Sequence, residues 1–290
     1  MPQFVIESGF ADRLTRRFGP QIVDWVQAAP ALAERLALEW RLTLNTMFRD
    51  GSTSLTVGCV TESGADAVLK LSPQLDVIAE QERVLRAFRL GGRVPRVFGS
   101  APEHGAMLLE RLPGGPATTP TAVQLAEVLS GLHGAVASPR EVVDNELRDG
   151  VEHFLARTET KLGLDGIAGV VLLEDIARAR RLRDRLVASQ SETVLLHGDL
   201  HYGNLLDCGP DRGLVAIDPK SCIGEPCFDA IDWVLDGAQP VSRKIDDLVA
   251  LTGFDGERLA DWCRVAAPVL AVAAITTGRD PGPLLRFGRS

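Results

Sequence analysis

A region of alternating apolar and polar residues gives way to a mainly helical pattern in the second part of this chain, and that contrast constrains the fold more than any other feature. Between residues 42 and 71 apolar and polar residues alternate, and two short turns, at 50–52 and 62–64, interrupt the alternation. A period of two is typical of half-buried strands, so we predict three strands of an antiparallel meander. After Leu-Pro-Gly-Gly-Pro at 112–116 the pattern becomes mainly helical. The predicted fold class is therefore α+β.

The predicted first lobe, residues 1–111, is built around a sheet. Beyond the meander, one helix and two strands are expected, at residues 76–88, 94–98 and 107–110. These elements complete a five-stranded antiparallel sheet with one inserted helix. Before the sheet, Pro20 predicts a helix to about residue 29 and Pro30 a second short one, as an appendage to this lobe.

The predicted second lobe, residues 112–290, is mainly helical. Thr119-Pro120 is expected to cap its first helix. The expected helices cover about residues 119–136, 141–163 and 170–190. Short strands are expected at residues 194–196, 205–206 and 214–217, with helices from there to the carboxyl end.

Length and charge exclude several classes of protein. A chain of 290 residues suits two lobes of ordinary domain size. Its formal charge of -8 argues against a nucleic-acid or anionic-membrane surface. The longest apolar stretch, Val265–Ile275, contains Pro268 and falls short of the ~20 residues of a membrane span.

Without a signal-like amino terminus, a cytoplasmic protein is expected. The five cysteines, an odd number without CxxC spacing, are expected to be reduced. No oligomeric state is predicted.

Two neighbouring segments carry the chemistry. His-Gly-Asp-Leu-His-Tyr-Gly-Asn at 197–204 is followed by Ile-Asp-Pro-Lys at 217–220. Asp199 is the candidate catalytic base, because a carboxylate beside an acceptor hydroxyl can orient it and take its proton. Asn204 and Asp218 offer hard oxygen ligands suited to magnesium on nucleotide phosphates. An Asp in a loop or at a strand end is often only a turn residue, but three such groups at this spacing predict a phosphotransferase.

A zinc site competes for the same segment, since His197-x-Asp199-x-His201 could supply metal ligands. Such a site normally recruits further His or Cys residues, and it would leave Asn204 and Asp218 unexplained. We therefore favour the phosphotransferase. In that case His197 is expected to hydrogen-bond the loop backbone and His201 to line the substrate site.

The first lobe supplies candidate nucleotide contacts. Lys70, in a predicted strand, needs a charged partner, and nucleotide phosphates with the helix carboxylate of Glu82 could provide it. Glu80 is the competing carboxylate, and a lysine reaching solvent from an edge strand is the alternative. Ser52, in the turn 50–54, could contact phosphates, although a segment with a single glycine favours an ordinary hairpin turn. The backbone of Glu110–Leu112 is placed to bind an adenine edge.

Acidic residues follow the second motif. If the segment is helical, Glu225, Asp229 and Asp232 share one face at i, i+4 and i+7. Like charges on one face need a neutralising partner. A cationic substrate is one candidate, and a basic residue of the protein or hydrogen bonds from the catalytic loop to Asp229 are the others. His133 is expected to be a packed, hydrogen-bonded core residue.

Taken together, these residues resemble the aminoglycoside phosphotransferase family, and within it the streptomycin 6-kinase (aminoglycoside/hydroxyurea resistance kinase) group. The general likeness rests on the motifs at 197–204 and 217–220. The closer likeness rests on four further segments, Trp40–Leu42, Val68–Leu71, Leu108–Gly114 and Gly224–Pro226 with Asp229. The resemblance runs from about residue 18 to about 275.

The resemblance implies a protein-kinase-like two-lobed fold with the nucleotide between the lobes. It implies that Asp199 is catalytic, that Asn204 and Asp218 bind Mg²⁺, that Lys70 binds the phosphates of ATP and that Asp229 braces the catalytic loop. The implied substrate is a cationic aminoglycoside, held in part by the acidic residues near 225–232. A kinase of an amino sugar or amino alcohol is the alternative enzyme, and a nucleotide-binding module without turnover is the alternative from another class.

Overall fold

The computed structural model describes residues 8–48 and 53–290, and it divides the chain into two compact units. Unit 1 comprises residues 1–89 and 95–113. Unit 2 comprises residues 90–94 and 114–290. The short segment 90–94 thus belongs to unit 2 although the residues on both sides of it belong to unit 1.

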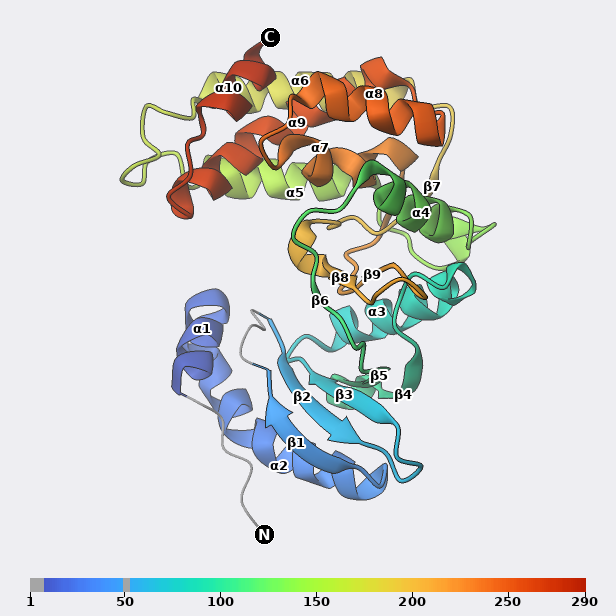
Figure 1. The fold of residues 1–290 in the computed structure, drawn as a ribbon. Helices are drawn as coiled ribbons and strands as arrows, with labels where there is room; N and C mark the ends of the chain where they lie inside the picture. Colours follow the sequence, from blue (N-terminus) through green and yellow to red (C-terminus); the bar gives the residue numbers. More distant parts are fainter. Residues whose placement is uncertain (1–7, 49–52) are drawn as a thin grey trace. The chain divides into compact units, whose positions relative to one another are not determined.

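Unit 1 contains the predicted five-stranded antiparallel sheet (Figure 1). Its strands are β1 (Thr43–Met47), β2 (Leu55–Val60), β3 (Asp66–Leu71), β4 (Val97–Ala101) and β5 (Ala106–Glu110). They lie in the order β1-β2-β3-β5-β4. The first three form the predicted meander, and α3 (Leu75–Phe88) is the predicted inserted helix.

The alternation read from the sequence separates the two faces of this sheet. Leu55, Val57, Leu69 and Leu71 are fully buried in one apolar cluster, together with residues of the amino-terminal helices. Lys70 points to the opposite face, because successive strand residues alternate. One strand thus contributes core packing on one face and a buried ammonium group on the other.

The amino-terminal helices differ from the prediction. The structure has α1 (Ser8–Phe18) and one continuous helix, α2 (Val23–Glu39), which contains Pro30. Proline normally interrupts a helix, since it removes a hydrogen bond and crowds the preceding turn. Here Ala29, Ala33 and Leu36 form one buried stripe that crosses the proline position. Continuous packing against the sheet therefore overrides the local helix-breaking signal.

Unit 2 is mainly helical, as predicted (Figure 1). Its helices are α4 (Ala122–His133), α5 (Leu147–Glu159), α6 (Leu173–Ala188), α7 (Ile231–Leu235), α8 (Val241–Thr252), α9 (Gly256–Thr276) and α10 (Gly282–Arg289). The 3-10 helix η5 (Tyr202–Asn204) ends the segment 197–204, and the 3-10 helix η6 (Pro226–Ala230) follows the segment 217–220. Each of the five cysteines carries a thiol rather than a disulfide in this structure.

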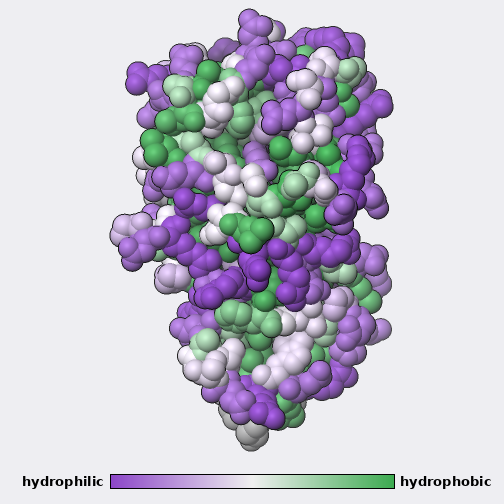
Figure 2. Space-filling model, turned by 90° about the vertical axis from the view of Figure 1, so that its right-hand side faces the viewer, coloured by the Kyte–Doolittle hydropathy of each residue, from purple (hydrophilic) through white to green (hydrophobic). Residues whose placement is uncertain are grey.

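Helix α9 is more apolar than the sequence analysis recognised. It meets the length and hydropathy of a membrane span, with a mean hydropathy of 1.5 over 18 residues. Half of that window is buried inside the fold, as in the core helix of a globular protein. On the face drawn in Figure 2, hydrophobic and hydrophilic residues are interspersed, without a continuous apolar belt.

Two small sheets of unit 2 position the motif residues. The first pairs β7 (Val194–Leu196) with β10 (Cys222–Gly224). The second has the order β6-β8-β9, with β6 (Gly115–Pro116), β8 (Leu205–Asp207) and β9 (Leu214–Ala216). The sequence predicted β7, β8 and β9. It did not predict β6 and β10, because two or three residues are too few to show an alternation.

The first helix of unit 2 begins two residues later than predicted. Thr121, not Thr119, is its N-cap, since the Thr121 hydroxyl accepts a hydrogen bond from the Gln124 N–H at 3.2 Å. The Gln124 side chain accepts in return from the Thr121 N–H at 2.9 Å. This reciprocal capping box satisfies two backbone donors at the helix start.

The cap makes a matched pair of variants informative. We expect Thr121→Ala to lower the free energy of unfolding by about 1 kcal/mol, because a helix donor loses its acceptor. We expect Thr119→Ala to change it by less than about 0.5 kcal/mol, as for an ordinary surface position. Urea unfolding followed by circular dichroism measures both, and equal effects of the two variants would contradict the assignment.

Candidate active site

The two motif segments lie on adjacent connections in unit 2. Residues 197–204 form the loop between β7 and β8 that carries the predicted catalytic residue Asp199, and we refer to it as the catalytic loop. Asp218 follows β9 by two residues. Since β8 pairs with β9, the end of the loop and Asp218 are brought to the same region. The Ile217 N–H donates to the Asn204 carbonyl at 2.9 Å, which ties the two segments together directly.

A buried carboxylate holds the start of the catalytic loop. The Asp229 Oδ2 atom accepts the His197 N–H at 2.7 Å, and its Oδ1 atom accepts the Gly198 N–H at 2.9 Å. The His133 Nε2 atom, from α4, lies 3.0 Å from Oδ2. Burial alone would raise the pKa of Asp229, but the hydrogen bond and charge of His133, with the loop contacts, keep that pKa below its ordinary value.

These contacts decide the roles of two residues. Asp229 braces the loop, as the family resemblance implies, and its predicted contact with substrate is corrected, because both carboxylate oxygens are occupied and the residue is only 3% exposed. His133 is the hydrogen-bonded core histidine that the sequence predicts. Gly198 also meets a local demand, since its φ is +79° and a Cβ there would lie 2.1 Å from the Lys220 carbonyl oxygen.

His197 joins the two motifs from inside the protein. Its Nε2 atom donates to the Ile217 carbonyl at 2.9 Å, and its Nδ1 atom accepts the Asp199 N–H at 3.4 Å. Burial lowers the pKa of His197, although nearby carboxylates oppose that shift, so the ring is neutral. The prediction that His197 bonds the loop backbone is confirmed.

Asp199 is partly exposed, and one of its oxygens is engaged. Its Oδ2 atom contacts the Lys220 ammonium group and lies 3.5 Å from the Asn204 Nδ2 atom. The His201 Nε2 atom is 4.0 Å away, and the His201 side chain is exposed. No described residue donates a hydrogen bond to the Asp199 Oδ1 atom. That oxygen is therefore available to a hydroxyl group.

Asn204 and Asp218 present oxygen atoms suited to a hard cation. The Asn204 amide nitrogen donates to the Asp199 carbonyl at 2.9 Å, and no described residue donates to the Asn204 Oδ1 atom. Asp218 has a φ of +55°, an uncommon conformation for a residue other than glycine and one that often marks a functional site. The pair could hold a magnesium ion, whose protein ligands are often one or two oxygen groups.

The structure does not support the zinc alternative. Among the residues it describes, no group of three or more His, Cys, Asp or Glu side chains could hold a metal ion. His197 uses both ring nitrogens in hydrogen bonds, so neither is free to ligate. The segment His197-x-Asp199-x-His201 is a positioning loop rather than a ligand cluster.

Residues 90–94, which we call the strap, contact the strand β9 that precedes Asp218. The Arg93 carbonyl accepts the Ala216 N–H of β9 at 2.7 Å. The Arg93 guanidinium group donates to the Arg212 carbonyl at 2.8 Å and to the Glu127 carboxylate at 3.0 Å. The strap thereby fixes the strand that leads to Asp218.

Two glycines let the strap approach α4 closely. A Cβ atom on Gly91 would lie 1.7 Å from the Gly131 carbonyl oxygen. A Cβ atom on Gly131 would lie 2.6 Å from the Arg93 Cγ atom and 2.9 Å from the Gly91 carbonyl oxygen. Backbone contact of this kind leaves no room for a side chain, so the pair of glycines sets the position of the strap.

Lys70 has a different partner from the one predicted. It is buried, and its ammonium group donates to the Gln81 Oε1 atom of α3 at 2.9 Å. Glu82 instead forms an ion pair with Arg86 at 2.9 Å, one helical turn away. This corrects the predicted Lys70–Glu82 pair, because the sequence could not resolve which residue of three neighbours faces the sheet. Only Gln81 of the three is buried.

The remaining nucleotide candidates have separate outcomes. The Glu110 carboxylate accepts the Arg96 N–H at 3.0 Å, and the Glu110 N–H donates to the Arg96 carbonyl. Leu112, two residues after the end of β5, makes no hydrogen bond to another described residue, so its backbone groups are available to a ligand. Ser52 lies outside the described residues.

The predicted acidic face is not a continuous helical face. Glu225 precedes the 3-10 helix η6, which Pro226 begins, and α7 starts only at Ile231. The Glu225 carboxylate binds the Arg258 guanidinium group, with Nη2 2.7 Å from Oε2, and accepts the Trp262 Nε1–H at 2.8 Å. The predicted substrate contact of Glu225 is therefore corrected to the alternative, neutralisation by a basic residue of the protein.

Asp232 differs from the other two acids. It is partly buried, and its carboxylate has no hydrogen bond or ion pair with a described residue. Burial raises the pKa of Asp232 to about 6, and the charges of Asp199, Asp236 and Asp229 add to the rise while His201 opposes it. A carboxylate close to the catalytic group that lacks a partner is suited to a cationic ligand.

Sequence reasoning missed three residues that shape this site. Lys220 was assigned no role, although it follows Asp218 by two positions and its N–H donates to the His197 carbonyl at 2.9 Å. Gln81 carries no charge, so the sequence gives no signal that it is the partner of Lys70. Arg93 lies in a loop of the first lobe, with no sequence signal that the loop packs on unit 2.

The strap gives a structural prediction. We expect Gly131→Ala to lower the free energy of unfolding by about 1–3 kcal/mol, because the new methyl group displaces Arg93. The amides of Ala216 and Ile217 should then exchange with solvent faster in hydrogen-exchange mass spectrometry. As a matched control, Gly150→Ala in α5 places its methyl group in open space and should stabilise the protein by about 0.5–1 kcal/mol. Unchanged exchange in Gly131→Ala would show that the strap does not fix β9.

Comparison with known proteins identifies the family of this chain. The sequence profile of the aminoglycoside/hydroxyurea antibiotic resistance kinases matches residues 39–278. Streptomycin 6-kinase of Streptomyces glaucescens is 30% identical over 282 residues, covering 89% of this chain and 86% of the relative. Hydroxyurea phosphotransferase of Kitasatospora aureofaciens is 30% identical over 254 residues, covering 82% of this chain and 71% of the relative.

A solved structure confirms the fold. The crystal structure of aminoglycoside phosphotransferase APH(4)-Ia superposes with a TM-score of 0.64 at 16% identity, covering 90% of this chain and 98% of that one. The sequence matches span most of the chain and include both catalytic motifs. The chain therefore belongs to the aminoglycoside/hydroxyurea antibiotic resistance kinase family, enzymes that transfer a phosphoryl group to small molecules.

Proposed function

We propose that this protein transfers the γ-phosphate of ATP to a hydroxyl group of a cationic aminoglycoside of the streptomycin type, and so inactivates the antibiotic. The observation that carries the proposal is the Asp199 carboxylate, which lies 3.5 Å from the Asn204 amide nitrogen in a loop hydrogen-bonded to Ile217, the neighbour of Asp218. The similarity to streptomycin 6-kinase supports the choice of acceptor. The reduced cysteines and the location of ATP suit a cytoplasmic enzyme.

Asp199 acts on the acceptor. Its Oδ1 atom accepts the acceptor hydroxyl, orients the oxygen toward the phosphorus atom and takes the proton as the new bond forms. Lys220 and Asn204 contact the Oδ2 side, which leaves Oδ1 as the working oxygen. Since phosphoryl transfer depends mainly on positioning and charge, a base of this kind contributes about 10²–10⁴-fold to the rate.

The remaining groups act on the nucleotide. Asn204 and Asp218 would hold Mg²⁺, which offsets the charge of the phosphates when bound. We propose that Lys70 contacts the α- and β-phosphates and that Gln81 orients its ammonium group. The backbone of Leu112 is proposed to bind the adenine edge, whereas the Glu110 N–H is engaged by the Arg96 carbonyl.

Asp232 and His201 are the proposed substrate contacts of this chain. Asp232 needs a cation, because its charged form has no partner among the described residues and its pKa is raised to about 6. An ammonium or guanidinium group of the acceptor would supply it. His201 is exposed beside Asp199 and can contact acceptor hydroxyls.

One comparison favours a second acceptor class. Hydroxyurea phosphotransferase is as similar in identity as streptomycin 6-kinase, and hydroxyurea is small and carries no positive charge. A kinase of an amino sugar or amino alcohol would still use Asp232, whereas a hydroxyurea kinase would not. The dependence on Asp232 therefore separates the candidates.

Catalysis by Asp199 is tested with ATP, magnesium and a panel of streptomycin, other aminoglycosides, amino sugars, amino alcohols and hydroxyurea. Mass spectrometry should detect the gain of one phosphate on streptomycin. Asp199→Asn should lower kcat at least about 100-fold while nucleotide binding, measured by calorimetry, is retained. The control Asp207→Asn, at an exposed position of β8, should keep full activity. Full activity in Asp199→Asn would overturn the mechanism, and nucleotide binding without any phosphorylated acceptor would favour a binding module.

The role of Asp232 gives opposite effects on stability and on substrate binding. Its folded-state pKa of about 6 exceeds the ordinary value of 3.8, so ionisation of Asp232 costs stability as the pH rises through this range. We expect Asp232→Asn to stabilise the protein at pH 7.5 by on the order of 1–2 kcal/mol, and the difference should vanish toward pH 4. Thermal unfolding at the two pH values measures it.

The same variant should bind the cationic acceptor less well. We expect the KM for streptomycin to rise about tenfold in Asp232→Asn, as for the loss of one charge-assisted contact, with little change in the KM for ATP. Hydroxyurea phosphorylation, if present, should be unaffected. A streptomycin KM equal to that of the wild type would remove Asp232 from the substrate site.

A further inference from the structure

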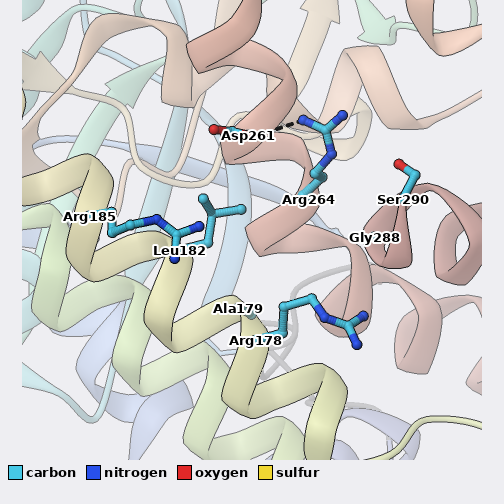
Figure 3. A pocket seen from close by; sticks show the side chains of 8 residues that line it. All are labelled: Arg178, Ala179, Leu182, Arg185, Asp261, Arg264, Gly288 and Ser290. Atoms are coloured by element: carbon cyan, nitrogen blue, oxygen red, sulfur yellow. Dashed lines mark hydrogen bonds and ion pairs between the residues drawn. The ribbon is translucent and has the colours of Figure 1, made fainter.

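A second pocket of unit 2 is lined by arginines and shares no residue with the proposed active site. It has a volume of about 190 Å³ and lies between α6, α9 and α10 (Figure 3). Arg178 and Arg185 come from α6, and Arg264 and Asp261 come from α9. Among the lining side chains, three guanidinium groups outnumber the single Asp261 carboxylate, in a chain of formal charge -8.

Helix α6 separates its arginines by face. Arg178 and Arg185 lie seven residues apart, with Leu182 between them on the same face of the helix. Three other arginines of α6 have a carboxylate partner 2.9 Å away or closer, namely Arg180, Arg181 and Arg183. The pocket arginines differ, since Arg185 has no ion pair with a described residue.

Arg178 is only weakly neutralised. Its Nη1 atom lies 3.8 Å from the Asp175 Oδ1 atom, beyond hydrogen-bond distance. Both oxygens of that carboxylate already accept hydrogen bonds from Arg289, at 2.8 and 2.6 Å. Asp175 is thus committed to α10, and the Arg178 charge faces the pocket without a dedicated acceptor.

Buried donors without acceptors point to a missing ligand. In the described part of the chain, four buried side-chain nitrogen or oxygen atoms have no hydrogen-bond partner, and two of them, Arg178 Nη1 and Arg264 Nε, belong to this pocket. Arg264 is otherwise held in place, with Nη1 2.7 Å from Asp261 and its guanidinium group 5.2 Å from the Phe287 ring centre. Native proteins rarely leave such donors unpaired.

We propose that this pocket is a binding site for a phosphate-type oxyanion. Arginine donors match the paired oxygens of a phosphoryl group, and the charge of the lining matches its negative charge. The volume equals that of about six water molecules, enough for a phosphate group and a few further atoms. Inorganic phosphate and the phosphoryl group of a small ester share this chemistry.

The test is calorimetric titration of the whole protein with inorganic phosphate at constant ionic strength. A Lys70→Ala background weakens phosphate binding at the proposed nucleotide site, so that the remaining binding reports the arginine pocket. We expect Arg178→Ala and Arg185→Ala each to weaken this binding about tenfold or more. The matched control is Arg181→Ala, on the same helix but with an exposed side chain, and it should bind as the background does.

Two further arms identify the ligand and can overturn the site. Glycerol 3-phosphate binding more tightly than inorganic phosphate would identify an ester, and the reverse order would identify the free ion. The proposal fails if titration with sodium chloride of equal ionic strength gives the same binding heat as titration with phosphate. It also fails if the pocket variants and Arg181→Ala weaken binding equally, since only general charge would then be involved, or if the background protein binds no phosphate.

Discussion

The catalytic loop depends on one buried charge. Asp229 accepts hydrogen bonds from two consecutive loop amides and from His133, so a single carboxylate connects η6, the loop and α4. Removing the partners of a buried carboxylate leaves an uncompensated charge that costs several kcal/mol. The loop therefore has one favourable position relative to Asp229. This position also fixes where Asp199 and Asn204 lie, because both belong to the loop. The preorganisation that phosphoryl transfer requires thus begins with a residue that does not touch substrate.

The presence or absence of a partner for the charge also distinguishes the roles of the acidic and basic residues of unit 2. Glu225 and Asp229 are buried with full sets of donors, and they maintain structure. Asp232 is partly buried and has no partner among the described residues. Its raised pKa reflects the free energy needed to ionise its carboxyl group there. Arg178 is similar, because its Nη1 atom is buried without an acceptor, whereas Arg180, Arg181 and Arg183 of α6 have carboxylate partners. A charged group kept near the interior without a partner costs stability, and a ligand of opposite charge can offset that cost.

Much of the fold could be predicted, and the errors have identifiable causes. The strands around Val57 and Leu69 were predicted because their alternation repeats over six residues. Pro30 was misread as a helix boundary because the apolar stripe that keeps α2 continuous is satisfied only by packing. Gln81 was missed because the helix phase over three neighbouring residues is not resolved by composition. The strap was not predicted, since its contact with β9 joins residues more than a hundred positions apart.

The sequence by itself determined the chemistry and the family. Two short segments contain Asp199, Asn204 and Asp218 at a characteristic spacing. Local loop geometry suffices to bring residues so close in the sequence together. Only the tertiary structure decided which acidic residues are free to bind a substrate. Asp229 meets His133 across 96 residues and Glu225 meets Arg258 across 33. Because partners at such separations are chosen by packing, the spacing of Glu225, Asp229 and Asp232 could not distinguish the two structural carboxylates from the one without a partner.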